Sequence, residues 1–320
     1  SVPLVTTTPA SDITQTSAQL GGDVTFHGGA NVTARGVCWS ISPGPTLADN
    51  TTNEGSGIGS FASSLTGLTM FTTYYVRAYA TNSEGTGYGD EISFTTLWDN
   101  STVTDYDGNV YNTVQIGSQI WIATNLYVTH YGDGAAIPLV EDEVEWDSLG
   151  HSDRAYCWYN NNSLYGNTLG ALYTWFTATN GDSSSLNPSG LQGVCPDGWH
   201  LPSDEEWKDL EMALGMSRDE ADKTGFRGTD EGGKLKHTDA LYWATPNSGA
   251  TNESGFGGRA AGNRGFLGDF QNFGYYAPFW SATQNDSKQA WTRVLIYNDA
   301  KVQRNPLTKT NGFAVRCARD

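Results

Sequence analysis

The chain has 320 residues, and its 35 acidic residues against 18 basic ones give it a formal net charge of −17. A charge of this sign repels nucleic acid and anionic membrane surfaces, so we expect no nucleic-acid partner. No stretch approaches the roughly 20 consecutive apolar residues of a membrane span, which argues against direct membrane insertion. The length favours two domains, and abundant glycine, threonine and aromatic residues favour strands and turns over helices.

Residues 1–97 predict one β-sandwich, because short strands of alternating apolar and polar residues are separated by turns throughout this part. The segment 68–78 resembles the corner before a late strand of fibronectin type III domains, where a tyrosine hydroxyl bonds back to the preceding backbone. Tyr74 holds that position, and Met70 stands where proline is common. We therefore expect a fibronectin or immunoglobulin-like sandwich over 1–97, joined near residue 98 to a second domain over 98–320.

The second domain opens on a hairpin signal, the pair Asp107-Gly108 between alternating residues. Such a pair favours a two-residue turn between antiparallel strands. A calcium-binding loop is the alternative interpretation. An EF-hand needs glycine at its sixth position and glutamate at its twelfth, whereas Gly108 is the fourth residue counted from Asp105 and Ile116 the twelfth. We therefore favour the turn.

Three helices are predicted in the second domain. Ser203 and Glu206 form a capping-box pattern, which predicts a helix over 204–214. Ser217 repeats the signal and predicts a shorter helix that Gly225 ends. The apolar spacing over 164–176 predicts a third helix.

Five ordered motifs resemble those of the Fibrobacter succinogenes major paralogous domain. They are GVCPDGWHLPSDEEW at 193–207, GGKLK at 232–236, GATNESGF at 249–256, FWSAT at 279–283 and GFAVRC at 312–317. The family's opening, a DGNVY turn followed by a tryptophan and an Asn-Leu pair, is present at Asp107–Tyr111, Trp121 and Asn125–Leu126.

This resemblance covers roughly residues 103–320. It implies a C-type-lectin-like fold, in the branch shared with formylglycine-generating enzymes and the variable receptor proteins of diversity-generating retroelements. The fold class expected for the whole chain is therefore mainly β with an α+β second domain. The resemblance also implies a bacterial protein that is secreted or exposed at the cell surface. The loop 257–264 departs from the family's usual aromatic and glycine-rich turn, so the family's specificity is not carried over to this chain.

The four cysteines allow three full pairings as well as partial ones, and their spacing alone does not choose among these. The resemblance implies that Cys195, before a helix, and Cys317, in the last strand, form a disulfide. Cys38 and Cys157 are expected to be buried free thiols.

Calcium-dependent sugar binding is not expected, because the Glu-Pro-Asn, Gln-Pro-Asp and Trp-Asn-Asp triplets that C-type lectins use are absent. The acidic run 141–147 is interpreted as a solvated loop, with a structural calcium ion as the alternative. No metal site and no other cofactor are predicted.

No enzymatic activity is predicted either. If two cysteines form the disulfide, the remaining two, Cys38 and Cys157, fall in different predicted domains, so they do not supply the cysteine pair of a formylglycine-generating oxidase's copper site. The Gly-x-Ser-x-Gly motif of hydrolases is absent, and Glu205-Glu206 are expected on an exposed helix face. His200 has no nucleophile beside it in the sequence and is interpreted as a packed or surface residue.

The last 60 residues are rich in tyrosine and amide side chains, which suit hydroxyl-rich or peptide ligands. In the retroelement proteins the corresponding segment is the ligand-binding face. Trp280 and Trp291 are expected in the core, and Asn272 belongs to the same segment. The candidate ligand-binding residues are Tyr275, Tyr276, Gln284, Asn285, Asp286, Tyr297, Asn298, Asp299, Gln303 and Asn305.

The function predicted from these observations is that of an adhesin whose partner is a glycan or a cell-surface protein. The alternative is a structural subunit of an extracellular filament or surface layer, in which the same surface or a sandwich edge self-associates.

Overall fold

The computed structural model of the chain describes residues 1–99 and 101–320. The chain divides into two compact units, Ser1–Asp99 and Asn100–Asp320. This division lies two residues beyond the boundary expected at 97/98, and residue 100, in the expected joint, lies outside the described residues. Strands dominate both units, so the fold class is mainly β as predicted.

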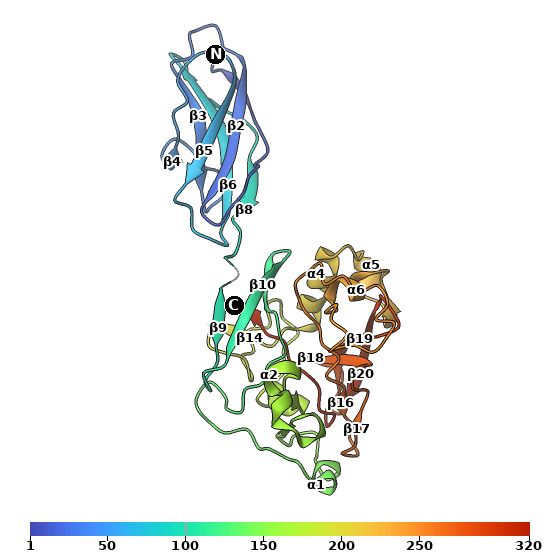
Figure 1. Cartoon of the computed structure of the whole chain (residues 1–320). Helices are drawn as coiled ribbons and strands as arrows, with labels where there is room; N and C mark the ends of the chain where they lie inside the picture. Colours follow the sequence, from blue (N-terminus) through green and yellow to red (C-terminus); the bar gives the residue numbers. More distant parts are fainter. Residues whose placement is uncertain (100) are drawn as a thin grey trace. The chain divides into compact units, whose positions relative to one another are not determined.

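The first unit is a β-sandwich of two antiparallel sheets (Figure 1). One sheet has the order β1-β2-β5, with β1 at Leu4–Thr7, β2 at Ser17–Phe26 and β5 at Gly59–Thr66. The other has the order β4-β3-β6-β7, with β8 also paired to β6. Its strands are β3 (Ala34–Ser40), β4 (Asn50–Thr51), β6 (Thr73–Asn82), β7 (Gly85–Tyr88) and β8 (Ile92–Thr95).

Alternation along the strands builds the core of this sandwich. Val24 and Leu65 from one sheet meet Val37 and Val76 from the other, and all four side chains are almost completely buried. The predicted tyrosine corner is confirmed, because the Tyr74 hydroxyl accepts a hydrogen bond from the backbone N–H of Thr69 at 2.9 Å.

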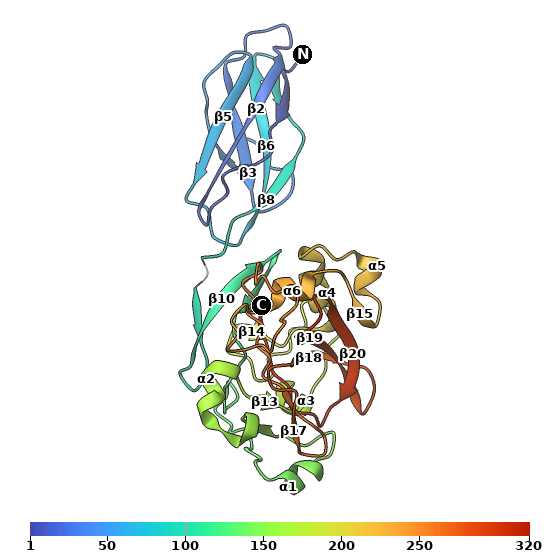
Figure 2. The ribbon, with the colours of Figure 1, turned by 45° about the vertical axis from the view of Figure 1, so that its right-hand side comes forward.

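The second unit contains two larger sheets, of which β18, β19 and β20 are labelled in Figure 2, and two two-stranded sheets. The first sheet has the order β14-β21-β11-β10-β9, and the second has the order β15-β20-β19-β18. The strands of the first are β9 (Thr102–Thr104), β10 (Val110–Ile116), β11 (Gln119–Ile122), β14 (Trp199–His200) and β21 (Ala318–Arg319). The strands of the second are β15 (Gly225–Arg227), β18 (Tyr276–Gln284), β19 (Gln289–Ile296) and β20 (Val302–Thr308). The two-stranded sheets pair β12 (Tyr156–Cys157) with β13 (Leu172–Tyr173), and β16 (Asn263–Arg264) with β17 (Phe270–Gln271).

Helices in the second unit are short. They are α1 (Glu143–Asp147), α2 (Gly166–Leu169), α3 (Trp175–Ala178), α4 (Asp204–Ala213), α5 (Arg218–Ala221) and α6 (Glu231–Leu235), with 3-10 turns η1 (Tyr159–Asn161) and η2 (Ser163–Tyr165). None of the helices in the described chain has the length and apolar character that a membrane span requires.

The predicted capping box at the start of α4 is confirmed. The Ser203 hydroxyl accepts a hydrogen bond from the Glu206 backbone N–H, and the Glu206 carboxylate accepts one from the Ser203 N–H. The helix ends at Ala213, one residue before the predicted end. Ser217 caps α5 as predicted, but α5 ends at Ala221, before Gly225 is reached.

The predicted helix over 164–176 is wrong. The chain there forms η2, α2, the strand β13 and α3 in succession. Gly170 breaks the helix because its φ of 82° lies in the left-handed region. A Cβ at Gly170 would also lie 2.4 Å from that of Asn125, so the helical spacing of the apolar residues reflects burial in several short elements.

The hairpin between β9 and β10 is present, but its predicted two-residue turn is wrong. The loop spans residues 105–109, and the Asp105 and Asn109 backbones close it with a hydrogen bond of 3.0 Å. The Asp105 carboxylate accepts bonds from the Asn109 backbone N–H, the Asn109 amide and the Tyr111 hydroxyl. A buried side chain therefore sets the length of the loop.

The predicted disulfide is confirmed between Cys195 and Cys317. It ties the segment before α4 to the last residues of the chain, next to β21. Cys38 and Cys157 are buried free thiols, as expected. Burial raises the pKa of Cys38 to about 11 and that of Cys157 to about 12.

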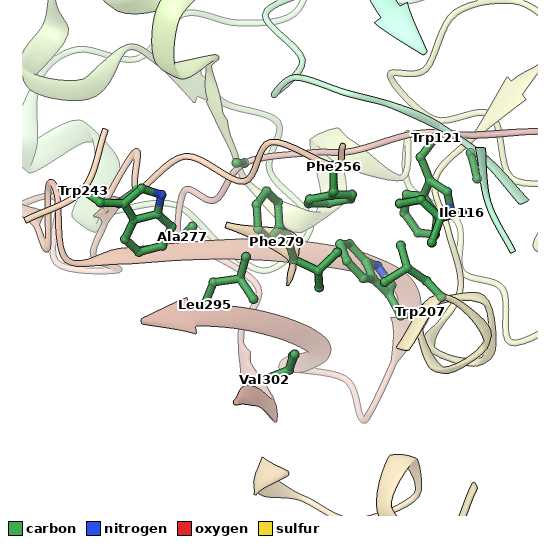
Figure 3. Packing of buried hydrophobic residues seen from close by; sticks show 14 residues of the cluster. Ile116, Trp121, Trp207, Trp243, Phe256, Ala277, Phe279, Leu295 and Val302 are labelled. Carbon is green, nitrogen blue, oxygen red and sulfur yellow. The ribbon is translucent and has the colours of Figure 1, made fainter. Parts of the chain in front are cut away.

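Aromatic residues form the central core of the second unit (Figure 3). Trp207 of α4 packs on Trp121 of β11 with ring centroids 4.9 Å apart, and on Phe279 of β18 at 5.7 Å. Phe256 contacts both tryptophans. These four rings join α4 to both larger sheets, so the 193–207 motif is mainly a packing motif.

Buried ion pairs hold α4 to the second sheet. The Glu211 carboxylate receives two hydrogen bonds from Arg227 of β15 and one from Arg293 of β19, at 2.6, 2.8 and 2.7 Å. Asp204 is bound in the same way by Arg293 and by Arg304 of β20. All of these side chains are nearly inaccessible to solvent, so each charge depends on its partners for compensation.

The expectation that Glu205-Glu206 lie on an exposed face is wrong for Glu206, which is 2 % exposed. Its carboxylate lies 2.6 Å from the His200 ring, and the other ring nitrogen lies 2.7 Å from the Asp320 carboxylate. Burial opposes protonation of His200, but the hydrogen bonds and charges of Glu206 and Asp320 prevail and raise its pKa. His200 is a packed residue, in agreement with the sequence interpretation.

Candidate ligand-binding groove

A groove of about 410 Å³ lies on the outer face of the four-stranded sheet. The inward residues of β18, Ala277 and Phe279, belong to the core that contains Trp207. Tyr276 and Pro278 alternate with them and line the groove instead. The sheet therefore separates the α4 side of this unit from a hollow that is open to solvent.

The loop around the β16–β17 hairpin forms one wall of the groove. Arg264, which is fully buried, donates hydrogen bonds to the carbonyl groups of Gly268, Val140, Glu141 and Asp142. Its guanidinium also lies over the Trp146 ring, 4.4 Å from the centroid. The loop 257–264, which departs from the family pattern, therefore ends at Arg264, and this arginine fixes the groove wall.

Amide side chains dominate the polar lining of the groove. The amide-bearing residues are Asn263, Gln271, Asn272, Gln289, Gln303, Asn305 and Asn311. One carboxylate, Asp269, also lines it and accepts a hydrogen bond from Gln271 at 2.5 Å. Among the described lining residues no lysine, arginine or histidine occurs. We call this hollow the amide groove.

Several of these side-chain amides have no hydrogen-bond partner among the residues that the structure describes. The side chains of Gln289, Gln303 and Asn311 make no hydrogen bond to other residues in ranges 1–99 and 101–320. By contrast, the Asn272 amide donates to the Asn263 side chain at 2.8 Å, and the Asn305 side chain accepts from the Gly225 N–H at 3.2 Å. The groove therefore combines fixed amides with amides that are available to a ligand.

Apolar surface accompanies the amides. Tyr276 is 37 % exposed, and Phe266 and Leu267 on the wall are 51 % and 56 % exposed. The buried Phe313 also contributes to the lining. A ring or aliphatic face of a ligand has surface to contact here, next to groups that bind hydroxyls.

The structure brings together three of the ten predicted ligand residues, Tyr276, Gln303 and Asn305, in the amide groove, along with Asn272. The other seven lie elsewhere. Tyr275 and Tyr297 contact each other edge to face, with centroids 4.9 Å apart. Gln284, Asn285 and Asp286 lie at the β18–β19 turn, and Asn298 and Asp299 lie at the opposite, β19–β20 turn.

The acidic residues at these turns serve the backbone. Asp286 accepts hydrogen bonds from the N–H groups of Lys288 and Gln289, and these bonds lower its pKa. The Asp299 carboxylate accepts from the Lys301 N–H. Both carboxylates therefore stabilise turns, which is the ordinary use of aspartate at such positions.

The two tryptophans expected in the core differ in how deeply they are buried. Trp280 is fully buried and donates its indole hydrogen bond to the Tyr173 carbonyl. Trp291 is only partly buried, so that expectation is wrong for it. The Arg304 guanidinium covers its ring at 3.8 Å, because Asp204 holds Arg304 in place.

The acidic run at 141–147 forms the end of a loop and α1, in which Asp142 caps the helix and Trp146 is buried. Within residues 1–99 and 101–320, no group of three or more histidine, cysteine, aspartate or glutamate side chains is arranged to hold a metal ion.

Sequence reasoning missed the wall of the groove, Asn263, Phe266, Leu267 and Gln271, together with Gln289 and Asn311. The run from Asn263 to Asn272 lies within the last 60 residues and has the same mixture of amide and aromatic residues as the predicted ligand residues. That composition was the available signal. The burial of Arg264, which folds the run against the sheet, had no signal of comparable strength.

A comparison with protein families finds that the model described as the Fibrobacter succinogenes major domain matches residues 114–319, which is more than half of the chain. No curated protein matches the sequence.

Among solved structures, the chain is similar to the sensor domain of the anti-sigma factor RsgI4 from Pseudobacteroides cellulosolvens, with 22 % identity, 30 % of this chain and 96 % of that chain covered, and a TM-score of 0.24. It is also similar to the sixth fibronectin type III domain of human fibronectin type III domain containing protein 3, with 22 % identity, 32 % and 88 % coverage and a TM-score of 0.24.

Proposed function

The chain belongs to the Fibrobacter succinogenes major domain family, and we propose that it is an extracellular bacterial adhesin that binds a neutral glycan in the amide groove without catalysing a reaction. The single observation that carries this proposal is the lining of the groove, which presents seven amides and no cationic side chain in its described residues. In this proposal the first unit serves as a spacer.

Amide side chains match sugar hydroxyls because both groups donate and accept hydrogen bonds. The free amides of Gln303 and Asn311 would supply such bonds, while Tyr276 would contact the apolar face of a sugar ring. A volume of about 410 Å³ is within the usual range of small-ligand sites, roughly 300–1,000 Å³. An acidic glycan would bring its charge to Asp269 with no cation in the groove to offset it, so we favour a neutral one.

The cellular setting is part of the proposal. The Cys195–Cys317 disulfide supports an oxidising, extracellular environment. The last strand of the second unit, β21, pairs with β11, one of the first strands of that unit. This pairing supports the C-type-lectin-like assignment. We propose that binding does not require calcium.

A matched pair of neighbouring tyrosines tests the proposal. Tyr276 lines the groove, whereas Tyr275 packs against Tyr297 outside its lining, and both are exposed to a similar extent. On a glycan array with EDTA present, the native protein and Tyr275→Ala should bind the same neutral glycans, and Tyr276→Ala should bind at least about ten-fold more weakly. Equal losses in the two variants, or hits confined to acidic glycans, would contradict the proposal.

Self-association is a second candidate function. An apolar hollow of about 320 Å³ is lined by Leu164, Leu241 and Phe273, and the two leucines are 80 % and 69 % exposed. Such side chains on one surface favour contact with another copy. Sedimentation of the native protein and of Leu164→Glu at micromolar concentration tests this, because an assembly built on the hollow should dissociate in the variant.

A further inference from the structure

A second cavity, of about 360 Å³, differs from the amide groove because a lysine lines it. It lies between the segment around α3 and the β18–β19 turn. Its lining includes Lys309 just after β20, His151, and the rings of Trp175 and Phe176. The hydroxyl-bearing residues Ser152, Ser183 and Ser287 also line it.

Lys309 is unusually poor in acceptors for a buried cation. It is 5 % exposed, and its ammonium group donates to the Gln284 amide oxygen at 3.1 Å and to the Ser287 carbonyl at 3.5 Å. The ammonium lies over the Trp175 ring, 4.2 Å from the centroid. In the described chain no carboxylate lies within ion-pair distance of it. Burial lowers the pKa of Lys309, which the charge of Asp286 opposes.

Three other buried cations of this unit have more or stronger acceptors than Lys309. Lys236 donates to three carbonyl groups at 2.7 to 2.9 Å. Arg227 and Arg293 bind carboxylates. Lys309 lines a cavity and has only one amide oxygen at good hydrogen-bond distance, so an anion entering the cavity would complete its coordination.

His151 supplies a second, independent sign of a ligand. Its Nδ1 atom is buried and has no hydrogen-bond partner in residues 1–99 and 101–320. The same residue lines the cavity that Lys309 faces. A buried ring nitrogen without a partner is costly unless something outside the chain binds it.

We propose that this cavity binds the carboxylate of a uronic acid, with the Lys309 ammonium as its cationic contact and an Nδ1–H group of His151 as a second donor. The three serines suit the hydroxyls of the sugar ring. Asp182 also lines the cavity, but its carboxylate accepts a hydrogen bond from the Ser183 N–H, and Asp286 is fixed in its own turn. The site is separate from the amide groove and does not rest on the function proposed for it.

Isothermal titration of the full chain with sodium glucuronate, glucose and sodium acetate tests this proposal. The native protein should bind glucuronate saturably, acetate more weakly and glucose not at this site. Lys309→Met should bind glucuronate at least about ten-fold more weakly. Lys288→Met, which changes an exposed lysine within the β18–β19 turn, should bind it within about two-fold of the native protein.

His151→Ala keeps the test independent of any folding defect in Lys309→Met, because His151 lies in a partly exposed loop. It should weaken glucuronate binding several-fold and leave the melting temperature unchanged. Absence of glucuronate binding to the native protein, equal affinity for glucose, or unchanged affinity in both Lys309→Met and His151→Ala would overturn the proposal.

Discussion

The two faces of the four-stranded sheet use polar side chains in opposite ways. On the α4 side, Arg293 and Arg304 are bound by carboxylates of the helix and are nearly inaccessible. On the outer side, Gln303 belongs to the same strand as Arg304, but its side-chain amide makes no hydrogen bond to another residue of the described chain. Because side chains alternate along a strand, one sequence provides both a stabilising face and a binding face. Substitutions on the first should therefore affect stability, and those on the second should affect binding.

The largest expected effect is from Glu211→Ala. This change leaves the buried guanidinium groups of Arg227 and Arg293 without their shared carboxylate. We expect a loss of about 3–5 kcal/mol in the free energy of unfolding of the second unit, measured by urea denaturation. Glu145→Ala, at an exposed position of α1, should change it by less than about 0.5 kcal/mol. A loss below about 1 kcal/mol for Glu211→Ala would show that this face does not depend on its ion pairs.

Acid should weaken the same face. Burial alone would raise the pKa of Asp204 from 3.8, but the charges of Arg293 and Arg304 prevail and hold it well below that value. The unfolded chain therefore takes up this proton first, so the contribution of Asp204 is present above about pH 4 and is lost as the pH falls toward its folded pKa. Melting temperatures measured from pH 6 to pH 2 should fall less steeply for Asp204→Asn than for the native protein. An equal fall of the melting temperature with pH in the two proteins would contradict the lowered pKa assigned to Asp204.

A smaller effect is expected at the helix cap. Ser203→Ala removes the hydroxyl that accepts the Glu206 N–H at the buried start of α4. We expect a loss of about 1 kcal/mol by urea denaturation. Ser217→Ala, at the more exposed cap of the single-turn helix α5, should cost less. The reverse order would indicate that α4 is held by its ion pairs alone.

The smallest effect on stability is expected for Gln303→Ala on the outer face. Its amide makes no hydrogen bond within the described chain, so the free energy of unfolding should change by less than about 0.5 kcal/mol. Affinity for the glycan identified on the array should nevertheless fall several-fold, as measured by titration. A stability loss comparable to that of Ser203→Ala would show that the Gln303 side chain stabilises the fold and would contradict its assignment to a binding face.

Much of the fold could be predicted from the sequence because its signals were local or carried by ordered motifs. The Ser203–Glu206 cap and the Tyr74 corner each depend on residues that are close in the chain, and both are confirmed. The prediction of a helix over 164–176 was wrong because the apolar spacing reflects which side chains are buried and not a continuous helix. The backbone changes direction at Gly170. The Cys195–Cys317 disulfide, separated by 122 residues, could be expected only through the family resemblance.

The candidate site was only partly predictable. Composition marked the last 60 residues but could not separate Tyr276, which lines the groove, from Tyr275, which packs on Tyr297. The groove wall depends on Arg264 reaching carbonyl groups more than 120 residues earlier in the chain. Contacts of this kind leave no periodic pattern, because they are set by how distant loops pack.

The most direct test of the account is an NMR titration of the native protein with a neutral glycan from the array, following the side-chain amide resonances. The account predicts that the amides of Gln303, Asn305 and Asn311 shift saturably, while those of Gln284 and Asn285, at the β18–β19 turn outside the groove, stay in place. Shifts confined to Gln284 and Asn285, with the groove amides unchanged, would contradict it.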